Sequence, residues 1–197
     1  MNSSQLTLLP LLAVALFATM KETKAQEQAT GEDQAYLSPS APVATGKAPG
    51  MKVRLLAENG GVKNYAIVLA KSDEVMSGLT DFAKQYKVTA ASFTAIGAFS
   101  NATVAWFDRT KKEYKLIPIK QQVELVSMIG DIALSGDQPV VHTHVAVASS
   151  DGTVMGGHLI EAHVFPTLEL FASVYPMALH KEPDDATALK LIDPLEK

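Results

Sequence analysis

Cysteine is absent from the 197-residue chain. Its absence excludes disulfide bonds, thiolate metal ligands and cysteine nucleophiles, so any metal must be held by nitrogen and oxygen ligands. It also excludes a lipoprotein, which needs a cysteine to acylate. An excess of basic residues is lacking too, because 17 Lys and Arg against 21 Asp and Glu give a net charge of −4. This composition offers no electrostatic reason to bind a phosphate-rich partner.

A long hydrophobic run is missing as well. The apolar, uncharged stretch Leu6–Ala18 is too short to span a bilayer as a helix of about 20 residues. A polar segment and the small-x-small sequence Thr23-Lys24-Ala25 follow it, as is typical of an export signal. No Lys or Arg precedes the run, so an uncleaved anchor and a start codon placed too early remain alternatives. We predict a signal peptide over residues 1–25, no membrane span after its cleavage, and a periplasmic or secreted protein.

The rest of the chain has room for one domain of ordinary size. Residues 26–50 are rich in Pro, Gly, Ala, Ser and Thr and show no apolar periodicity, which predicts a flexible linker. We place the folded domain at residues 51–180. The tail at residues 181–197 is charged and contains two prolines, so it is either loose or a short docked end.

One helix is predicted inside this domain. Ser72 offers an N-cap, and Asp73 and Glu74 then fall in the first turn, where acidic residues are favoured. The apolar residues that follow recur at helical spacing and form one stripe, at Val75, Met76, Leu79, Phe82, Ala83 and Tyr86.

The other segments of the domain are β-rich runs bounded by turn residues. They cover residues 51–56, 65–70, 89–96, 102–108, 114–119, 123–134, 140–148 and 153–164, while residues 167–175 fit either a strand or a helix. One helix against a series of consecutive strands predicts a mostly antiparallel sheet. The fold class is therefore α+β.

Histidines are concentrated in the second half of the domain. His142 and His144 are two residues apart in an apolar β-rich run, so both imidazoles project from one face of a strand. If Ser150-Asp151-Gly152 forms a three-residue hairpin loop, His158 lies opposite His144 and diagonal to His142. Opposed side chains stand about 4.5–5.5 Å apart at Cβ, so three imidazoles at these positions can converge on one ion.

This geometry leaves alternatives open. A slip of one residue in the register would turn His158 to the opposite face of the sheet. Strand histidines also occur as ordinary core or surface residues without a metal. The glycines Gly156 and Gly157 beside His158 could add a bulge, and they remove side chains, which leaves space for a ligand or another subunit.

Two carboxylates are candidate catalytic groups beside such a metal. Glu124 and Glu161 each lie in an apolar strand, where an unpaired charge is costly, and either could move protons for a metal-bound water or substrate. In the register described above, Glu161 stands opposite Val141, on the other face of the sheet from the histidines. A structural or subunit-contact carboxylate is the alternative for both residues.

Residues 64–176 resemble a known family. The segments LTDFAKQYKV, FTAIGAFSNATVAWFD, VELVSMIGDIAL and PVVHTHVAVASSDGTVMGGHLIEAHVFPTLEL are similar, in this order, to the motifs of the plant-and-prokaryote conserved (PPC) domain. The histidine pattern is similar to the bacterial branch of that family. The resemblance implies a compact α+β domain that assembles as a homotrimer, a Zn²⁺ ion on His142, His144 and His158, and a fold similar to that of acetolactate decarboxylase.

Three functions follow as hypotheses. The first is an exported, metal-dependent lyase or hydrolase that acts on a small metabolite at an open zinc site. The second is a metal-stabilised trimeric binding or assembly module without catalysis, in which a neighbouring subunit supplies the fourth ligand. The third and weakest is a DNA-binding protein, because the chain has neither a basic cluster nor the Arg-Gly-Arg-Pro hook of the plant relatives. The sequence does not decide whether the protein is an enzyme.

Overall fold

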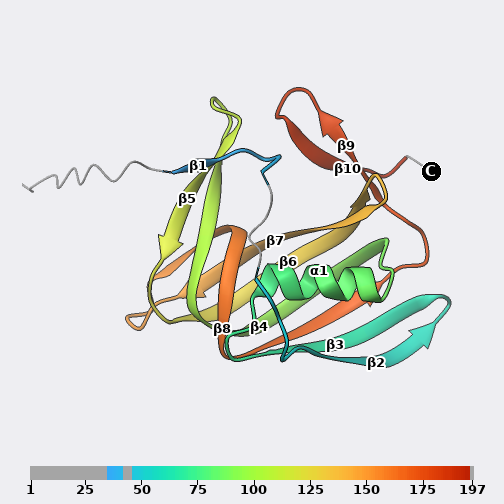
Figure 1. The fold of residues 1–197 in the computed structure, drawn as a ribbon, viewed down its shortest axis with the longest axis horizontal. Coiled ribbons are helices and arrows are strands. Elements are labelled where there is room, and N and C mark those ends of the chain that lie inside the picture. Colours follow the sequence, from blue (N-terminus) through green and yellow to red (C-terminus); the bar gives the residue numbers. More distant parts are fainter. Residues whose placement is uncertain (1–34, 42–45, 196–197) are drawn as a thin grey trace, which may run out of the picture. The chain divides into compact units, whose positions relative to one another are not determined.

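The computed structural model describes residues 35–41 and 46–195. The signal peptide expected at residues 1–25 lies outside the described residues, as do parts of the expected linker. Ten strands and one helix form the described part of the chain, and the sheet is mainly antiparallel (Figure 1). The prediction of an α+β fold is confirmed.

The elements follow one another in this order: β1 Tyr36–Leu37, β2 Lys52–Asn59, β3 Val62–Ala70, α1 Val75–Gln85, β4 Ala90–Asp108, β5 Glu113–Ile119, β6 Val123–Ser135, β7 Gln138–Ala148, β8 Val154–Val174, β9 His180–Asp184 and β10 Leu189–Asp193.

Four long strands pair in a closed ring. β4 pairs with β6, β6 with β7, β7 with β8, and β8 with β4, all antiparallel. This ring is possible because β4 and β8 run for 19 and 21 residues and are interrupted by bulges. Gly97 marks one of these bulges, and a Cβ there would lie 2.4 Å from the carbonyl oxygen of Thr167. The segments predicted separately at residues 153–164 and 167–175 are thus one strand.

The helix covers one side of the sheet. Its buried residues include Leu79 and Phe82, which join Ile67 and Leu69 of β3 in the hydrophobic core. The core also takes in alternate residues of β7, such as Val145. Because side chains alternate along a strand, the even-numbered residues of β7, including both of its histidines, lie on the face away from the helix.

The N-cap of the helix differs from the prediction. Glu74, not Ser72, is the cap, and its carboxylate accepts hydrogen bonds from the backbone N–H groups of Met76 and Ser77 at 3.0 and 2.7 Å. Ser72 lies two residues earlier, with a φ of 73°. Glu74 is 2% exposed, and the caps preferred in isolated helices are short polar residues. The long side chain of Glu74 can act as a cap because surrounding structure fixes it.

Parts of the expected linker and tail are packed against the domain. β1 pairs with β5, and the backbone N–H of Gly50 donates to the Asp73 carboxylate at 2.9 Å. Residues 35–41 and 46–50 of the expected linker thus make contacts with the domain, mostly through backbone groups, which leave no apolar pattern in the sequence. Of the alternatives for the tail, the docked end is found. β9 and β10 form a hairpin, and the N–H of Leu134 in β6 donates to the carbonyl of Leu179 at 2.8 Å.

Within residues 35–41 and 46–195, the helix is neither long nor apolar enough to cross a bilayer.

Candidate metal centre

The predicted histidine hairpin is present with the predicted register. The backbone N–H of Ser149 donates to the carbonyl of Thr153 at 2.9 Å, and Gly152 takes the left-handed φ of 82° that closes the loop. His144 is the Cα partner of His158. No slip or bulge occurs between them and the turn, so His158 lies on the same face of the sheet as the two histidines of β7.

The three imidazoles converge. The ring centroids of His142 and His144 are 5.2 Å apart, and those of His142 and His158 are 5.1 Å apart. The rings of His144 and His158 are 5.4 Å apart. One ring nitrogen from each residue lies within 4.8 Å of the others. A tetrahedral ion with bonds of about 2.0–2.1 Å holds its nitrogen ligands roughly 3.4 Å apart, so small side-chain rotations would bring these three atoms to binding distance.

The protonation of the cluster suits a cation. Burial, followed by the neighbouring His142 and His144, lowers the pKa of His158 to about 4. Burial and His142 also lower the pKa of His144. Both rings are therefore neutral at pH 7, which is the state that binds metal. The Nδ1 atom of His158 is buried and has no hydrogen-bond partner in the described structure. These residues fit a metal ion.

A carboxylate missed by the sequence analysis orients one of the rings. Asp131 of β6 is the Cα partner of His142, and its Oδ2 lies 3.2 Å from His142 Nδ1. This contact leaves Nε2 of His142 available as a ligand atom, in the manner of carboxylate–histidine–metal groups. The second carboxylate oxygen, Oδ1, lies 2.8 Å from Nζ of Lys181 in β9.

The charge of Asp131 is stabilised by these two partners. Burial alone raises the pKa of the Asp131 carboxyl, but the hydrogen bonds with His142 and Lys181 outweigh it and hold the pKa below its ordinary value. Asp131 is therefore ionised at neutral pH. The sequence signal for it was weak, since a single Asp in a strand has no distinctive spacing, and Lys181 was assigned to the tail.

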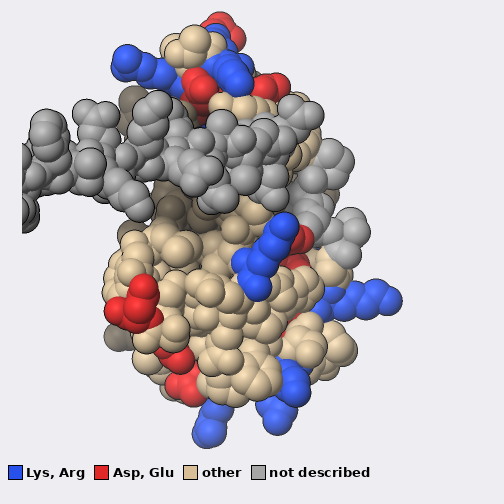
Figure 2. Space-filling model, turned by 90° about the vertical axis from the view of Figure 1, so that its left-hand side faces the viewer, with Lys and Arg blue, Asp and Glu red and all other residues tan. Residues whose placement is uncertain are grey.

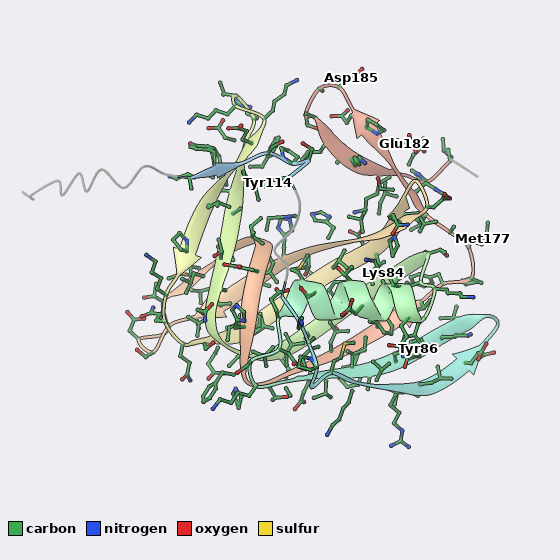
Figure 3. All side chains as sticks on the ribbon, in the orientation of Figure 1. Lys84, Tyr86, Tyr114, Met177, Glu182 and Asp185 are labelled. Carbon is green, nitrogen blue, oxygen red and sulfur yellow. The ribbon has the colours of Figure 1, made fainter. Side chains whose placement is uncertain are left out.

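An aromatic wall also borders the cluster. The ring of Tyr114 stacks on His158 with centroids 4.6 Å apart and planes at 19°. Phe107 of β4 packs edge-on against Tyr114 at 5.3 Å. Burial raises the pKa of the Tyr114 hydroxyl, which is therefore protonated at neutral pH. Figure 3 shows Tyr114 on β5 at the end of the molecule that also carries the β9–β10 hairpin, where Glu182 and Asp185 are labelled.

Gly156 and Gly157 allow neighbouring strands to pack closely and do not leave space for a ligand. A Cβ at Gly156 would lie 2.1 Å from the carbonyl oxygen of Val145, and one at Gly157 would lie 2.6 Å from that of Ala105. The space expected beside the site is thus filled by neighbouring backbone. Gly130 of β6 acts similarly, because its Cβ would lie 2.5 Å from the carbonyl oxygen of His142. Close approach of strands, and not an open cavity, requires these glycines.

Glu161 lies on a different face from the predicted one. The β7–β8 register ends at His158, and beyond it β8 pairs with β4, with His158 opposite Ala105 and Glu161 opposite Thr103. A bulge in β8 separates these two pairs. Because Ala105 and Thr103 share a face of β4, Glu161 shares the face of His158. Its Oε1 accepts a hydrogen bond from the Thr103 hydroxyl at 3.0 Å.

Glu124 is separated from the histidines. It is exposed and pairs with Ala148, which is four residues beyond His144 along β7, or roughly 13 Å by strand rise. It lines a separate surface hollow of about 500 Å³ together with Glu169 and the apolar residues around them. The structure does not bring Glu124 into the histidine cluster.

The surface charge is mixed on the face seen in Figure 2. On the face in Figure 2, Lys and Arg stand apart from one another and alternate with Asp and Glu over a largely uncharged surface. Over the described residues drawn in that view, no continuous basic patch is visible.

Comparison with known proteins identifies the family. The sequence profile of the Plants and Prokaryotes Conserved (PCC) domain, the PPC domain named above, matches residues 56–176. The chain therefore belongs to this family, and the β9–β10 hairpin lies beyond the matched region.

Solved structures share the fold. A plant- and prokaryote-conserved protein from Pyrococcus horikoshii is 30% identical, with a TM-score of 0.64 over 74% of this chain and 97% of that one. A metal-containing protein from Archaeoglobus fulgidus is 29% identical, with a TM-score of 0.63 over 71% of this chain and 98% of that one. Among curated proteins, a bifunctional protein GlmU from Synechococcus is 29% identical over 131 residues. That stretch is 65% of this chain but only 20% of the relative.

Proposed function

We propose that this protein binds a divalent metal ion, zinc in the first instance, through His142, His144 and His158. The convergence of three imidazoles from two paired strands is the observation that carries this proposal. Asp131 supports it by orienting His142, and the unpartnered Nδ1 of His158 is the kind of buried polar atom that a ligand satisfies. The similar protein from Archaeoglobus fulgidus, described as metal-containing, is consistent with it.

Metal content after purification and dialysis tests this proposal. We expect about one zinc per chain in the wild-type protein, as one closely spaced three-histidine group predicts. His144→Ala should reduce the content to below about 0.1 per chain, because two remaining imidazoles form a much weaker site, and should leave a folded domain. His180→Ala, which removes a histidine of β9 outside the cluster, is the control and should retain the metal. Full zinc occupancy in His144→Ala would exclude the assignment.

The reaction that this centre best supports is a lyase or hydrolase step on a small metabolite. The three histidines would hold the ion and leave a coordination position for water or substrate, and the ion would supply Lewis acidity towards that group. Glu161 is the remaining candidate for proton transfer, since it shares the histidine face and is held by Thr103. Glu124 is too distant along the strand to serve this centre within one chain.

A trimeric assembly module is the second candidate, and an apolar patch on the same face favours it. The patch consists of Ile96, Ile129 and Phe171, which are 62%, 59% and 59% exposed. Thr94 is the pairing partner of both Ile129 and Phe171, and Ile129 is the partner of His144, so the patch adjoins the histidines. Exposed apolar patches of this kind mark interaction sites. A neighbouring subunit on it could supply a fourth metal ligand in place of water.

Export to the periplasm or beyond completes the proposal. It rests on the apolar run and cleavage pattern in residues 1–25, which lie outside the described residues. N-terminal sequencing of the protein from its native host decides it, with a mature start near Gln26 expected and an intact Met1 against it.

A further inference from the structure

Lys181 is a buried charge beside the metal centre. The residue is 6% exposed, and lysine is almost never buried to this degree without a partner. Its partner is the Asp131 carboxylate, whose Oδ1 lies 2.8 Å from Lys181 Nζ, while Oδ2 of the same carboxylate contacts His142. Lys181 is provided by the C-terminal hairpin, which lies outside the region matched by the family.

The hairpin that carries Lys181 is held on two sides. At its tip, Lys112 of the β4–β5 turn donates from Nζ to the carbonyl of Asp185 at 3.0 Å. From β10, Lys190 donates to the Ser135 hydroxyl at 2.7 Å. The N–H of Leu134 also donates to the carbonyl of Leu179 just before β9, so the position of the ammonium group next to Asp131 does not depend on the Lys190 contact alone.

The ion pair determines the charge around the three histidines. Asp131 is the only carboxylate that contacts a histidine of the cluster among the hydrogen bonds and ion pairs of the described residues. Alone it would offset half of the charge of a divalent ion held by three neutral rings. Lys181 cancels the carboxylate charge, so the Asp131–Lys181 pair is neutral as a whole. The charge of about +2 on a divalent ion in the centre is therefore not offset by its neighbours. The low exposure of Lys181 limits screening of this effect by salt.

We infer that Lys181 makes the open position of the metal centre a site for a small anion, a carboxylate being the simplest class. Lys181 acts through Asp131 and is a positioning and charge-setting residue without contact to the ion. This inference rests on the proposed metal binding. The inference explains why a buried ammonium group lies beside the centre. Metal binding alone does not need that group, since a positive charge near the centre weakens the attraction for a cation.

Acetate binding to the Co²⁺-loaded full-length protein tests the inference. Visible absorption of Co²⁺ reports a change of ligand at the metal, and ionic strength is held constant with a non-coordinating salt. We expect acetate to bind to the wild-type protein and Lys181→Met to weaken it by about three- to thirtyfold, as one lost charge in a partly solvated site predicts. Lys190→Met removes a lysine from the same hairpin without touching Asp131, and it should match the wild type within about twofold.

A second pair of variants separates charge from structure. Asp131→Asn should bind acetate more tightly than the double variant Asp131→Asn/Lys181→Met, in which no buried charge is left unpaired. Both proteins carry the same change beside His142, so the difference in acetate affinity between them reports the charge of Lys181. Equal affinities would mean that the charge of Lys181 has no effect on the anion.

The outcomes distinguish the inference from the proposed function. If wild-type protein takes up no Co²⁺, the metal proposal itself fails. If Co²⁺ binds but acetate does not perturb its spectrum, or if Lys181→Met behaves like Lys190→Met, the inference about Lys181 is wrong while metal binding stands. Should Lys181→Met alone fail to fold, the difference in acetate affinity between Asp131→Asn and the double variant decides the question, and equal affinities there would overturn the inference.

Discussion

At the scale of single residues, His158 combines the properties of a metal ligand and a destabilising buried base. Its ring is packed between Tyr114 and the two histidines of β7, and burial leaves Nδ1 without a partner. Such an environment favours the neutral ring. A residue in this state is ready to bind a cation, and without one it makes the domain sensitive to acid.

The acid sensitivity of the metal-free protein follows from the pKa of His158. Because its folded-state pKa is about 4 and the unfolded value is near 6.5, the unfolded chain binds the extra proton in this range and stability falls as pH falls. We expect about 2 kcal/mol lower unfolding free energy at pH 5 than at pH 7.5 from this group. Urea denaturation of chelator-treated protein measures it, and His158→Gln should show a clearly smaller pH dependence. An equal dependence in both proteins would contradict the burial argument.

At the scale of elements, the start of α1 depends on one buried carboxylate. Glu74 caps the helix and also approaches the backbone N–H of Ala162 in β8 at 3.4 Å. The residue thus links the helix to the strand that carries His158. A short polar cap of the usual kind could not reach both elements.

Removal of this cap should be costly. We expect Glu74→Ala to lower the unfolding free energy by roughly 2–4 kcal/mol, since it loses the cap and leaves buried N–H groups unsatisfied. Asp81→Ala, which removes an exposed carboxylate from the same helix, should change it by less than about 0.5 kcal/mol. Chemical denaturation of the two variants gives the comparison. Similar values would mean that Glu74 contributes no more than a surface charge.

At the scale of the whole molecule, the exposed apolar patch of Ile96, Ile129 and Phe171 is expected to contact a partner. A second and third copy of the chain are the partners that the family resemblance implies. We expect light scattering to give a mass about three times that of one chain, and Phe171→Asp to shift it towards the monomer, because a charge in an apolar interface is costly.

The control for this experiment is Leu191→Asp, which places the same charge on an apolar residue of β10 that is 47% exposed and lies outside the patch. It should leave the mass unchanged. A monomeric wild-type protein, or a Phe171→Asp variant that assembles fully, would exclude the patch as the subunit contact.

The chain's local patterns predicted the helix, most of the long strands and the histidine hairpin, but not β1, β9 or β10. His142, His144 and His158 are joined by a single turn, so alternation along two strands and the loop length determine their common face. The same alternation failed for Glu161, since the pairing with β7 ends at His158 and a bulge in β8 against β4 shifts the alternation of side chains beyond it. A bulge depends on the partner strand, and local sequence does not reveal it.

Asp131 lies opposite His142 across the short β6–β7 turn, but only the tertiary structure brought Tyr114 and Lys181 to the histidines. Each comes from a different strand, and Lys181 is separated from Asp131 by the whole of β7 and β8 in the chain. Their contacts arise when β4, β6, β7 and β8 close into a ring and the C-terminal hairpin docks on β6. The sequence alone therefore determined which nitrogen atoms can meet a metal, because that geometry is local. The Lys181 charge and the Tyr114 ring beside them depend on long-range contacts, which only folding decides.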